Sequence, residues 1–194
     1  MQDLVKWVAA LGVAMSWVTV VESATVTVYT DKTAWEAALS GPYLTESFAD
    51  DQLNAGVTFV SSESGHINPA EECYQDVLAS QSQNAPTTIW SFVPQIVAFG
   101  GLWTLGGPGG SGNSLQVYLA GESQYVGSIS NSYGGEFWGF ISDTPFTSVQ
   151  LIGGPGSNQQ NYKLDDMTYA PVPEPATLTL LAVGLGSLLA RRRR

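Results

Sequence analysis

Short runs of alternating apolar and polar residues cover most of this chain, and Gly, Pro, Asn and Ser separate them. Alternation with a period of two is typical of β-strands that bury one face. In the second half the runs recur about every ten residues, the spacing of antiparallel sandwiches. The pattern predicts one all-β domain, an antiparallel β-sandwich of the jelly-roll type, with strands at residues 24–30, 45–48, 56–61, 87–92, 95–105, 114–119, 124–129, 137–141, 147–152 and 162–169.

Two stretches break the strand pattern. Residues 31–41 predict one short helix, with Asp31 or Thr30 as N-cap, Trp35 on the buried face and Gly41 as the stop signal. Residues 61–86 are polar and without periodicity, which predicts a long loop.

Both ends of the chain carry apolar segments. Residues 1–23, with Lys6 before an apolar run, predict a secretory signal peptide cleaved before Ala24, and an uncleaved N-terminal anchor is the alternative. Residues 176–190 are uncharged and precede Arg191, Arg192, Arg193 and Arg194. At about 1.5 Å per residue, such a helix spans about 22 Å, which makes a short transmembrane helix whose arginines stay in the cytoplasm. The predicted domains are therefore 1–23, 24–172 and 173–194.

A Pro-Glu-Pro sequence, formed by Pro173, Glu174 and Pro175, stands before this apolar run and basic end. The order of the three features resembles the PEP-CTERM sorting signal of exported bacterial proteins. That resemblance implies an exosortase as partner, which removes the tail and releases or transfers the protein to the cell surface or extracellular matrix. The alternatives are a permanent membrane anchor and a buried core helix.

The body resembles a recurrent ectodomain of PEP-CTERM proteins, which is similar in outline to carbohydrate-binding sandwiches. The matching segments are residues 98–103 (Ala-Phe-Gly-Gly-Leu-Trp), 107–109, 137–142 and 164–166. This resemblance implies no settled activity.

Charge narrows the range of partners. The chain has 17 acidic and 7 basic residues and a net charge of −10, so nucleic acid and anionic lipid are poor partners for its body. Cys73 is the only cysteine, which excludes an intramolecular disulfide, and we interpret it as a buried thiol rather than a nucleophile or an intermolecular bridge.

Catalytic motifs are missing from the sequence. His66 is the only histidine, no Gly-x-Ser-x-Gly surrounds a candidate serine, and the Gly-rich residues 106–112 lack the Lys-Ser/Thr ending of a phosphate loop. The sequence therefore predicts no catalytic residue and no enzyme, although a polysaccharide hydrolase or lyase using two carboxylates is an alternative.

Calcium is the one cofactor with a candidate site. Glu46 in an early strand and Asp165 in the last strand could share a calcium ion, as in sandwiches that use calcium to join their first and last strands. The alternative is that both are structural carboxylates with hydrogen-bonded partners.

Aromatic side chains are the candidate sugar ligands. Phe137 and Trp138 are consecutive in a predicted strand, so one of them is expected to face outward, and Trp138 is the candidate for stacking on a sugar ring. The sequence thus predicts an exported, non-enzymatic protein of the cell surface or matrix that associates with extracellular polysaccharide, with a calcium-dependent carbohydrate-binding module as alternative.

Overall fold

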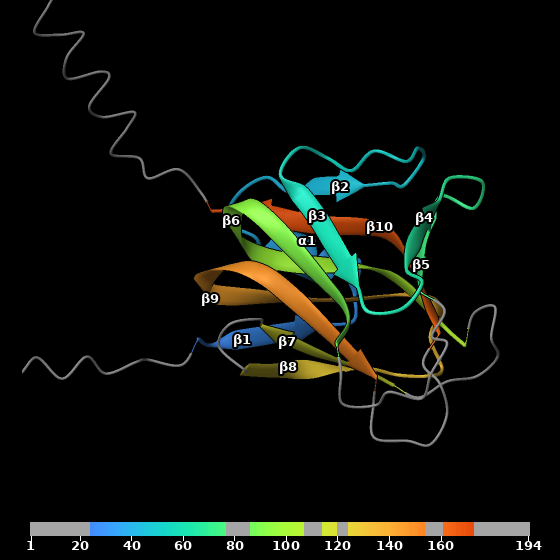
Figure 1. The fold of residues 1–194 in the computed structure, drawn as a ribbon. Helices are drawn as coiled ribbons and strands as arrows, with labels where there is room; N and C mark the ends of the chain where they lie inside the picture. Colours follow the sequence, from blue (N-terminus) through green and yellow to red (C-terminus); the bar gives the residue numbers. More distant parts are fainter. Residues whose placement is uncertain (1–23, 77–85, 107–113, 120–123, 154–160, 173–194) are drawn as a thin grey trace, which may run out of the picture.

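The computed structural model describes residues 24–76, 86–106, 114–119, 124–153 and 161–172. This part of the chain folds into antiparallel strands and one short helix (Figure 1). The elements are β1 (Val26–Tyr29), α1 (Lys32–Ala38), β2 (Leu44–Glu46), β3 (Val57–Ser61), β4 (His66–Asn68), β5 (Cys73–Asp76), β6 (Pro86–Leu105), β7 (Leu115–Leu119), β8 (Gln124–Ile129), β9 (Gly134–Gly153) and β10 (Tyr162–Pro171).

Two long strands, β6 and β9, run through both layers of the sandwich and pair with each other antiparallel in each. In the first layer the order is β3, the N-terminal part of β6, the C-terminal part of β9, β7 and β8. In the second it is β4, β5, β10, the C-terminal part of β6, the N-terminal part of β9 and β1, with β2 also beside β10. The antiparallel sandwich is confirmed.

The predicted strand boundaries need two corrections. Residues 87–92 and 95–105 form the single strand β6, and residues 137–141 and 147–152 form the single strand β9. The separating residues, such as Val93 and Pro94, lie where the register between β6 and β9 shifts. A β-bulge bends a strand without ending it. The break in the apolar–polar alternation therefore marks the corner at which the strand passes from one layer to the other.

The predicted loop at residues 61–86 is wrong in its described part, which contains β4 and β5. All four residues of β5 are buried, including the polar Gln75 and Asp76. A strand that is buried on both faces and carries polar residues has no apolar–polar alternation, so the pattern hid it.

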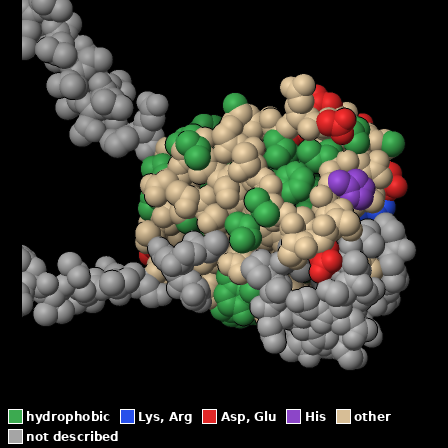
Figure 2. All heavy atoms as spheres, viewed as in Figure 1, with side chains coloured by type: hydrophobic (Ala, Val, Ile, Leu, Met, Phe, Trp, Pro, Cys, Tyr) green, Lys and Arg blue, Asp and Glu red, His purple; other side chains and the backbone are tan. Residues whose placement is uncertain are grey.

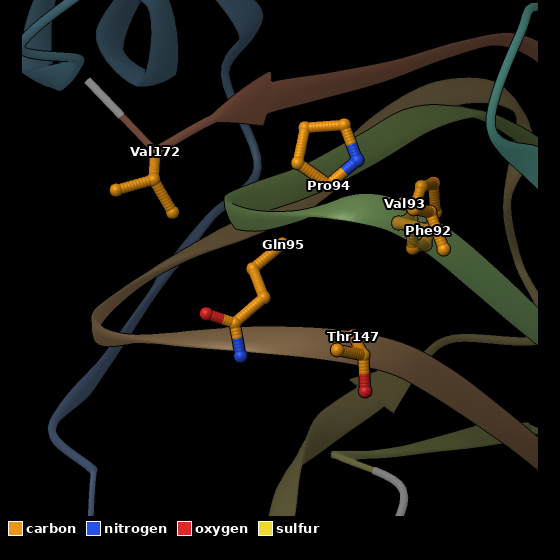
Figure 3. Close-up of a pocket in the computed structure, with 6 residues that line it drawn as sticks. All are labelled: Phe92, Val93, Pro94, Gln95, Thr147 and Val172. Carbon is orange, nitrogen blue, oxygen red and sulfur yellow. The ribbon is translucent and has the colours of Figure 1, made fainter. Parts of the chain in front are cut away.

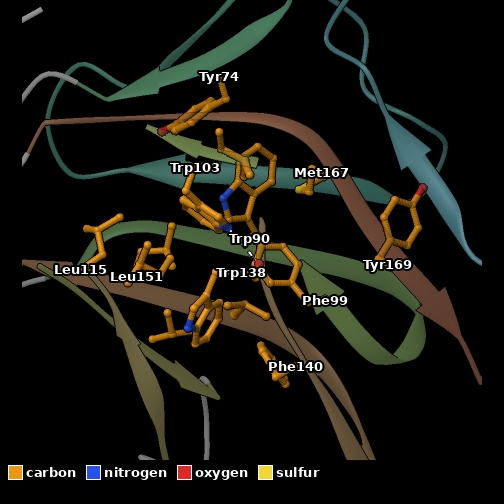
Figure 4. Packing of buried hydrophobic residues seen from close by; sticks show 14 of the residues in the cluster. Tyr74, Trp90, Phe99, Trp103, Leu115, Trp138, Phe140, Leu151, Met167 and Tyr169 are labelled. Carbon is orange, nitrogen blue, oxygen red and sulfur yellow. Dashed lines mark hydrogen bonds between the residues drawn. The ribbon is translucent and has the colours of Figure 1, made fainter. Parts of the chain in front are cut away.

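The main core lies between the two layers (Figure 4). Its largest members include Trp90, Phe99, Trp103, Trp138 and Tyr169, with the Trp103 Nε1 donating to the carbonyl oxygen of Trp138 at 3.0 Å. These rings meet at centroid distances such as 6.3 Å for Phe99 and Trp103, in the edge-to-face geometry that aromatic quadrupoles favour.

A second, smaller cluster covers the outer face of the β10 layer. The helix α1 begins at the N-cap Asp31, whose side chain accepts a hydrogen bond from Ala34 N, and it buries Trp35 completely. Trp35 packs on Phe137 and donates from Nε1 to the carbonyl oxygen of Phe140 at 3.2 Å. The prediction that Trp35 is a core residue is confirmed.

Two glycines make this packing fit. Gly100 and Gly139 lie opposite each other in β6 and β9, and a Cβ on Gly139 would meet Gly100 Cα, Phe99 O and Phe137 Cζ at 2.9 Å each. Because two of these atoms belong to the backbone, they cannot move aside cheaply. The close approach lets the Phe137 ring lie across both strands beneath Trp35.

Replacing Gly139 tests this packing. We expect G139A to lower the free energy of unfolding by about 1–3 kcal/mol, because the added methyl overpacks the interface. Gly134 lies in the same strand and has no atom within 4 Å of a built Cβ, so G134A is the matched control and should change stability by less than about 0.5 kcal/mol. Urea unfolding of the tail-free protein measures both, and an equal effect of the two substitutions would contradict the packing argument.

Candidate functional site

The end of β10 is where the folded body gives way to the C-terminal segment. Pro171 pairs with Ile96 of β6, and Val172 N donates to the carbonyl oxygen of Gln95 at 3.3 Å. β10 has paired neighbours on both sides. β6 lies on one side, and β5 and β2 lie on the other. β10 is therefore bonded to β6 up to Val172.

A pocket of about 450 Å³ opens beside this end of β10. Figure 3 shows Val172 on one side of it and Phe92 and Val93 of β6 on the other, with Thr147 of β9 below. We call it the exit pocket, and its lining residues are Phe92, Val93, Pro94, Gln95, Thr147 and Val172. None of these side chains carries a charge.

The backbone of the exit pocket is held in place by Gly56. Val93 N donates to the carbonyl oxygen of Gly56 at 2.8 Å, and Gly56 has a positive φ of 83°. A Cβ on Gly56 would lie 1.8 Å from the carbonyl oxygen of Val93. Only glycine fits this approach, so the bend of β6 that forms the pocket is preformed.

The outer surface of the first layer forms a second feature, which we call the uncharged face. Cross-strand pairing places Tyr125, Tyr118, Gln150, Ile89 and Val60 in one row across all five strands. The outward side chains of the described residues are Thr58, Val60, Ile89, Ser91, Gln116, Tyr118, Tyr125, Ser128, Ser148, Gln150 and Ile152. No member of this set is charged, and Figure 2 shows acidic side chains mainly toward the margins of this side of the molecule.

Two tyrosines lie at one end of the uncharged face. Tyr118 and Tyr125 are cross-strand partners with ring centroids 5.4 Å apart, and Tyr125 is 51% exposed. Their hydroxyls are held by neighbours on the same face, because Tyr118 donates to Gln116 Oε1 at 3.2 Å and Tyr125 pairs with Ser128 Oγ at 2.7 Å. The pair presents aromatic surface together with oriented polar groups.

The prediction that Trp138 is exposed is wrong. Trp138 is 2% exposed and belongs to the main core, while its neighbour Phe137 points to the opposite face and packs under Trp35. Alternation holds in β9, but α1 covers the face that the strand pattern left open.

Tyr118 and Tyr125 are candidate ligand residues that were not predicted from the sequence. A signal was present in β7, where Leu115, Val117 and Leu119 alternate with Gln116 and Tyr118. That alternation already turned Tyr118 outward. The partner strand that aligned Tyr125 with it came only from the fold.

Glu46 and Asp165 are placed on opposite sides of their layer. Glu46 lies opposite Met167, a residue of the main core, and its two carboxylate oxygens accept from Phe48 N at 3.0 Å and Asn54 N at 2.6 Å. Asp165 lies opposite Leu102 on the outer side and accepts from Asp166 N at 2.6 Å.

The two carboxylates therefore do not meet. Each accepts hydrogen bonds from backbone N–H groups, as expected of the structural carboxylates that were the alternative to a calcium site. Within the described residues, no group of three or more His, Cys, Asp and Glu side chains could hold a metal ion. Calcium binding stays a prediction without a site of its own in this part of the chain.

A pocket of about 160 Å³ surrounds Cys73 and Asp165 and is lined also by Glu71 and Lys163. Lys163 forms a salt bridge with Glu71 at the surface, and this partner lowers the pKa of the Glu71 carboxyl. Burial raises the pKa of the Cys73 thiol, so the buried-thiol interpretation agrees with the structure.

The most deeply buried carboxyl is that of Asp76. Its Oδ2 accepts hydrogen bonds from Ser61 Oγ at 3.1 Å, Tyr74 OH at 3.2 Å and Thr88 Oγ1 at 2.7 Å. Thr88 is also hydrogen-bonded to the Tyr162 hydroxyl. Because β3 and β6 here belong to one layer and β5 and β10 to the other, this network fastens the two layers together at one end.

Taken together, the described residues form a β-sandwich ectodomain whose last paired strand leads directly into a C-terminal tail. Comparison with family models finds the PEP-CTERM protein-sorting motif at residues 171–194. The chain thus carries a PEP-CTERM sorting motif at its C-terminal end, which supports an exported protein that an exosortase sorts. No curated protein and no solved structure matched it.

The sorting residues themselves lie outside the described residues. This holds for Pro173, Glu174 and Pro175, for the basic end at residues 191–194 and for the predicted signal peptide at residues 1–23. In the part of the chain that the structure describes, no helix is long and apolar enough to span a bilayer. The motif match begins at Pro171, so it overlaps the last residues of the folded body.

The Asp76 network predicts a pH dependence of stability. Burial raises the pKa of the Asp76 carboxyl, so its contribution to stability is present below the usual aspartate pKa of about 3.9 and is lost as the pH rises through the raised value. We expect the free energy of unfolding to fall between pH 4 and pH 8, and to fall less in D76N. Urea unfolding at both pH values measures this.

Asp143 provides a control of opposite sign. Hydrogen bonds from the side chain and the backbone of Thr25, the latter from Thr25 N at 2.9 Å, lower the pKa of its carboxyl, so D143N should be less stable than the wild type above pH 4. A D76N variant whose pH dependence equals that of the wild type would show that Asp76 is not the group responsible.

Proposed function

We propose that this exosortase-sorted protein is a non-enzymatic component of the cell surface or extracellular matrix that associates with a neutral extracellular polysaccharide. Before processing, its C-terminal segment anchors it in the membrane. The uncharged face is the binding surface, and the tyrosine pair at its end makes the main contact with sugar rings.

The observation that carries the proposal is the absence of charge from the uncharged face in a chain with a net charge of −10. An acidic protein that leaves the outward residues of five strands neutral presents a surface without repulsion for an uncharged polymer. The serine, threonine and glutamine side chains there donate and accept hydrogen bonds, as sugar hydroxyls require. The Tyr118–Tyr125 pair adds flat apolar surface with polar edges.

The positions of three carboxylates agree with a non-enzymatic role. A glycosidase needs one carboxyl as acid and another as base or nucleophile, both facing the bound sugar. Here Glu46, Asp76 and Asp143 are engaged by backbone amides or buried hydroxyls, and none of them lies on the uncharged face. These residues stabilise the fold, and the expected effect of the protein on a polysaccharide is binding without cleavage.

Substitution of Tyr125 tests the binding surface. We expect Y125S to weaken binding of the tail-free protein to the neutral polysaccharide fraction of its host about tenfold, because a stacked ring contributes roughly 1 kcal/mol or more. Leu44 is 50% exposed and lies in β2, away from this face, so L44S is a control that removes a similar fraction of apolar surface. Co-sedimentation measures binding, and equal losses in both variants would contradict the assignment.

Processing at the C-terminus has its own test. In the native host we expect the intact mass of the mature protein to lack residues 191–194, and a strain without the exosortase to retain them. Incubation of the mature protein with the polysaccharide should leave the molar mass of the polymer unchanged. A fall in that mass would contradict the non-enzymatic role without affecting the sorting result.

A further inference from the structure

We propose that the exit pocket is a docking site for the exosortase, which inserts an apolar side chain from the surface around its active site. The pocket lies on the ectodomain, so the enzyme would recognise a folded surface in addition to the tail. This inference rests on the sorting motif and is independent of polysaccharide binding.

The exit pocket lies close to the Pro-Glu-Pro sequence along the chain. Val172 lines the exit pocket, and Pro173 of the Pro-Glu-Pro sequence is the next residue. The predicted membrane segment begins at Ala176, four residues after Val172. Even a fully extended chain covers at most about 14 Å over four residues. An enzyme that binds the Pro-Glu-Pro sequence is therefore brought close to the wall of the pocket.

The chain stays bonded to β6 up to the end of β10. Pro171 is still paired with Ile96, and Val172 N is bonded to Gln95 O. Because β10 pairs with β2 up to Tyr169 and with β6 up to Pro171, pulling its end out of the layer would break its hydrogen bonds to β6. The enzyme consequently meets the folded body, and the motif match itself starts within β10 at Pro171.

The surface of the exit pocket is apolar or uncharged. Val93 is 76% exposed at the rim of the pocket, and the other lining residues are apolar or uncharged. Val172, which also lines the pocket, is 37% exposed, and exposed apolar side chains grouped beside a hollow are typical of a contact surface. A concave pocket accommodates a protruding side chain, whereas a flat bilayer would leave it empty, and among the described residues no Lys or Arg lines it to engage lipid head groups. An apolar projection of a protein is therefore the occupant that fits.

Two matched substitutions test the proposal in the full-length protein. Val93 and Val60 are both exposed valines, 76% and 69%, but Val60 lies on the uncharged face and not in the pocket. We expect V93E to lengthen the half-time of tail removal in a pulse-chase experiment about tenfold, because a charge replaces an apolar contact. We expect the tails of V60E and V93I to be removed at the wild-type rate.

Other outcomes separate the alternatives. Wild-type processing of V93E would overturn the proposal, as would equal delays in V93E and V60E. Thermal unfolding of both purified mature variants checks that the fold is intact. Binding of the mature wild-type protein, but not of V93E, to phosphatidylethanolamine–phosphatidylglycerol vesicles would overturn it in favour of lipid contact. Unchanged polysaccharide binding in Y125S would overturn the proposed function alone and would leave the docking proposal intact.

Discussion

The antiparallel pairing of β6 with β9 is the constraint on which the rest of the fold depends. Both strands pass through the two layers, so their ladder sets the position of each layer relative to the other. The Gly100–Gly139 contact brings them close enough for Phe137 and Trp35 to cover one side. At the far end, Asp76 joins hydroxyls from both layers. The sandwich is therefore connected through strands and hydrogen bonds as well as through its aromatic core.

This architecture makes the C-terminal strand an internal part of the body. β10 lies between β6 on one side and β5 and β2 on the other, and its last residues adjoin the sorting motif. Its last residues, Pro171 and Val172, are held by β6 alone, because the pairing with β2 ends at Tyr169. The exit pocket is formed at the same place by the bend of β6.

Acidic side chains and the uncharged face have separate roles in this molecule. Carboxylates such as Glu46 and Asp76 lie inside the fold, where they accept hydrogen bonds and stabilise turns and layers. The face of the first layer is left to neutral hydrogen-bonding groups and two tyrosines. The net negative charge thus disfavours anionic partners, without entering the surface that we propose for polysaccharide.

The sequence by itself determined the β class, the helix that begins at Asp31 and the sorting signal, because each depends on neighbouring residues or on their order along the chain. Tertiary structure alone decided the rest. Burial of Trp138 depended on where β9 and its neighbours packed, β5 was hidden by its buried polar residues, and Tyr118 met Tyr125 only through strand pairing. The separation of Glu46 from Asp165 had the same cause, since opposite faces of a layer follow from register, which local pattern does not specify.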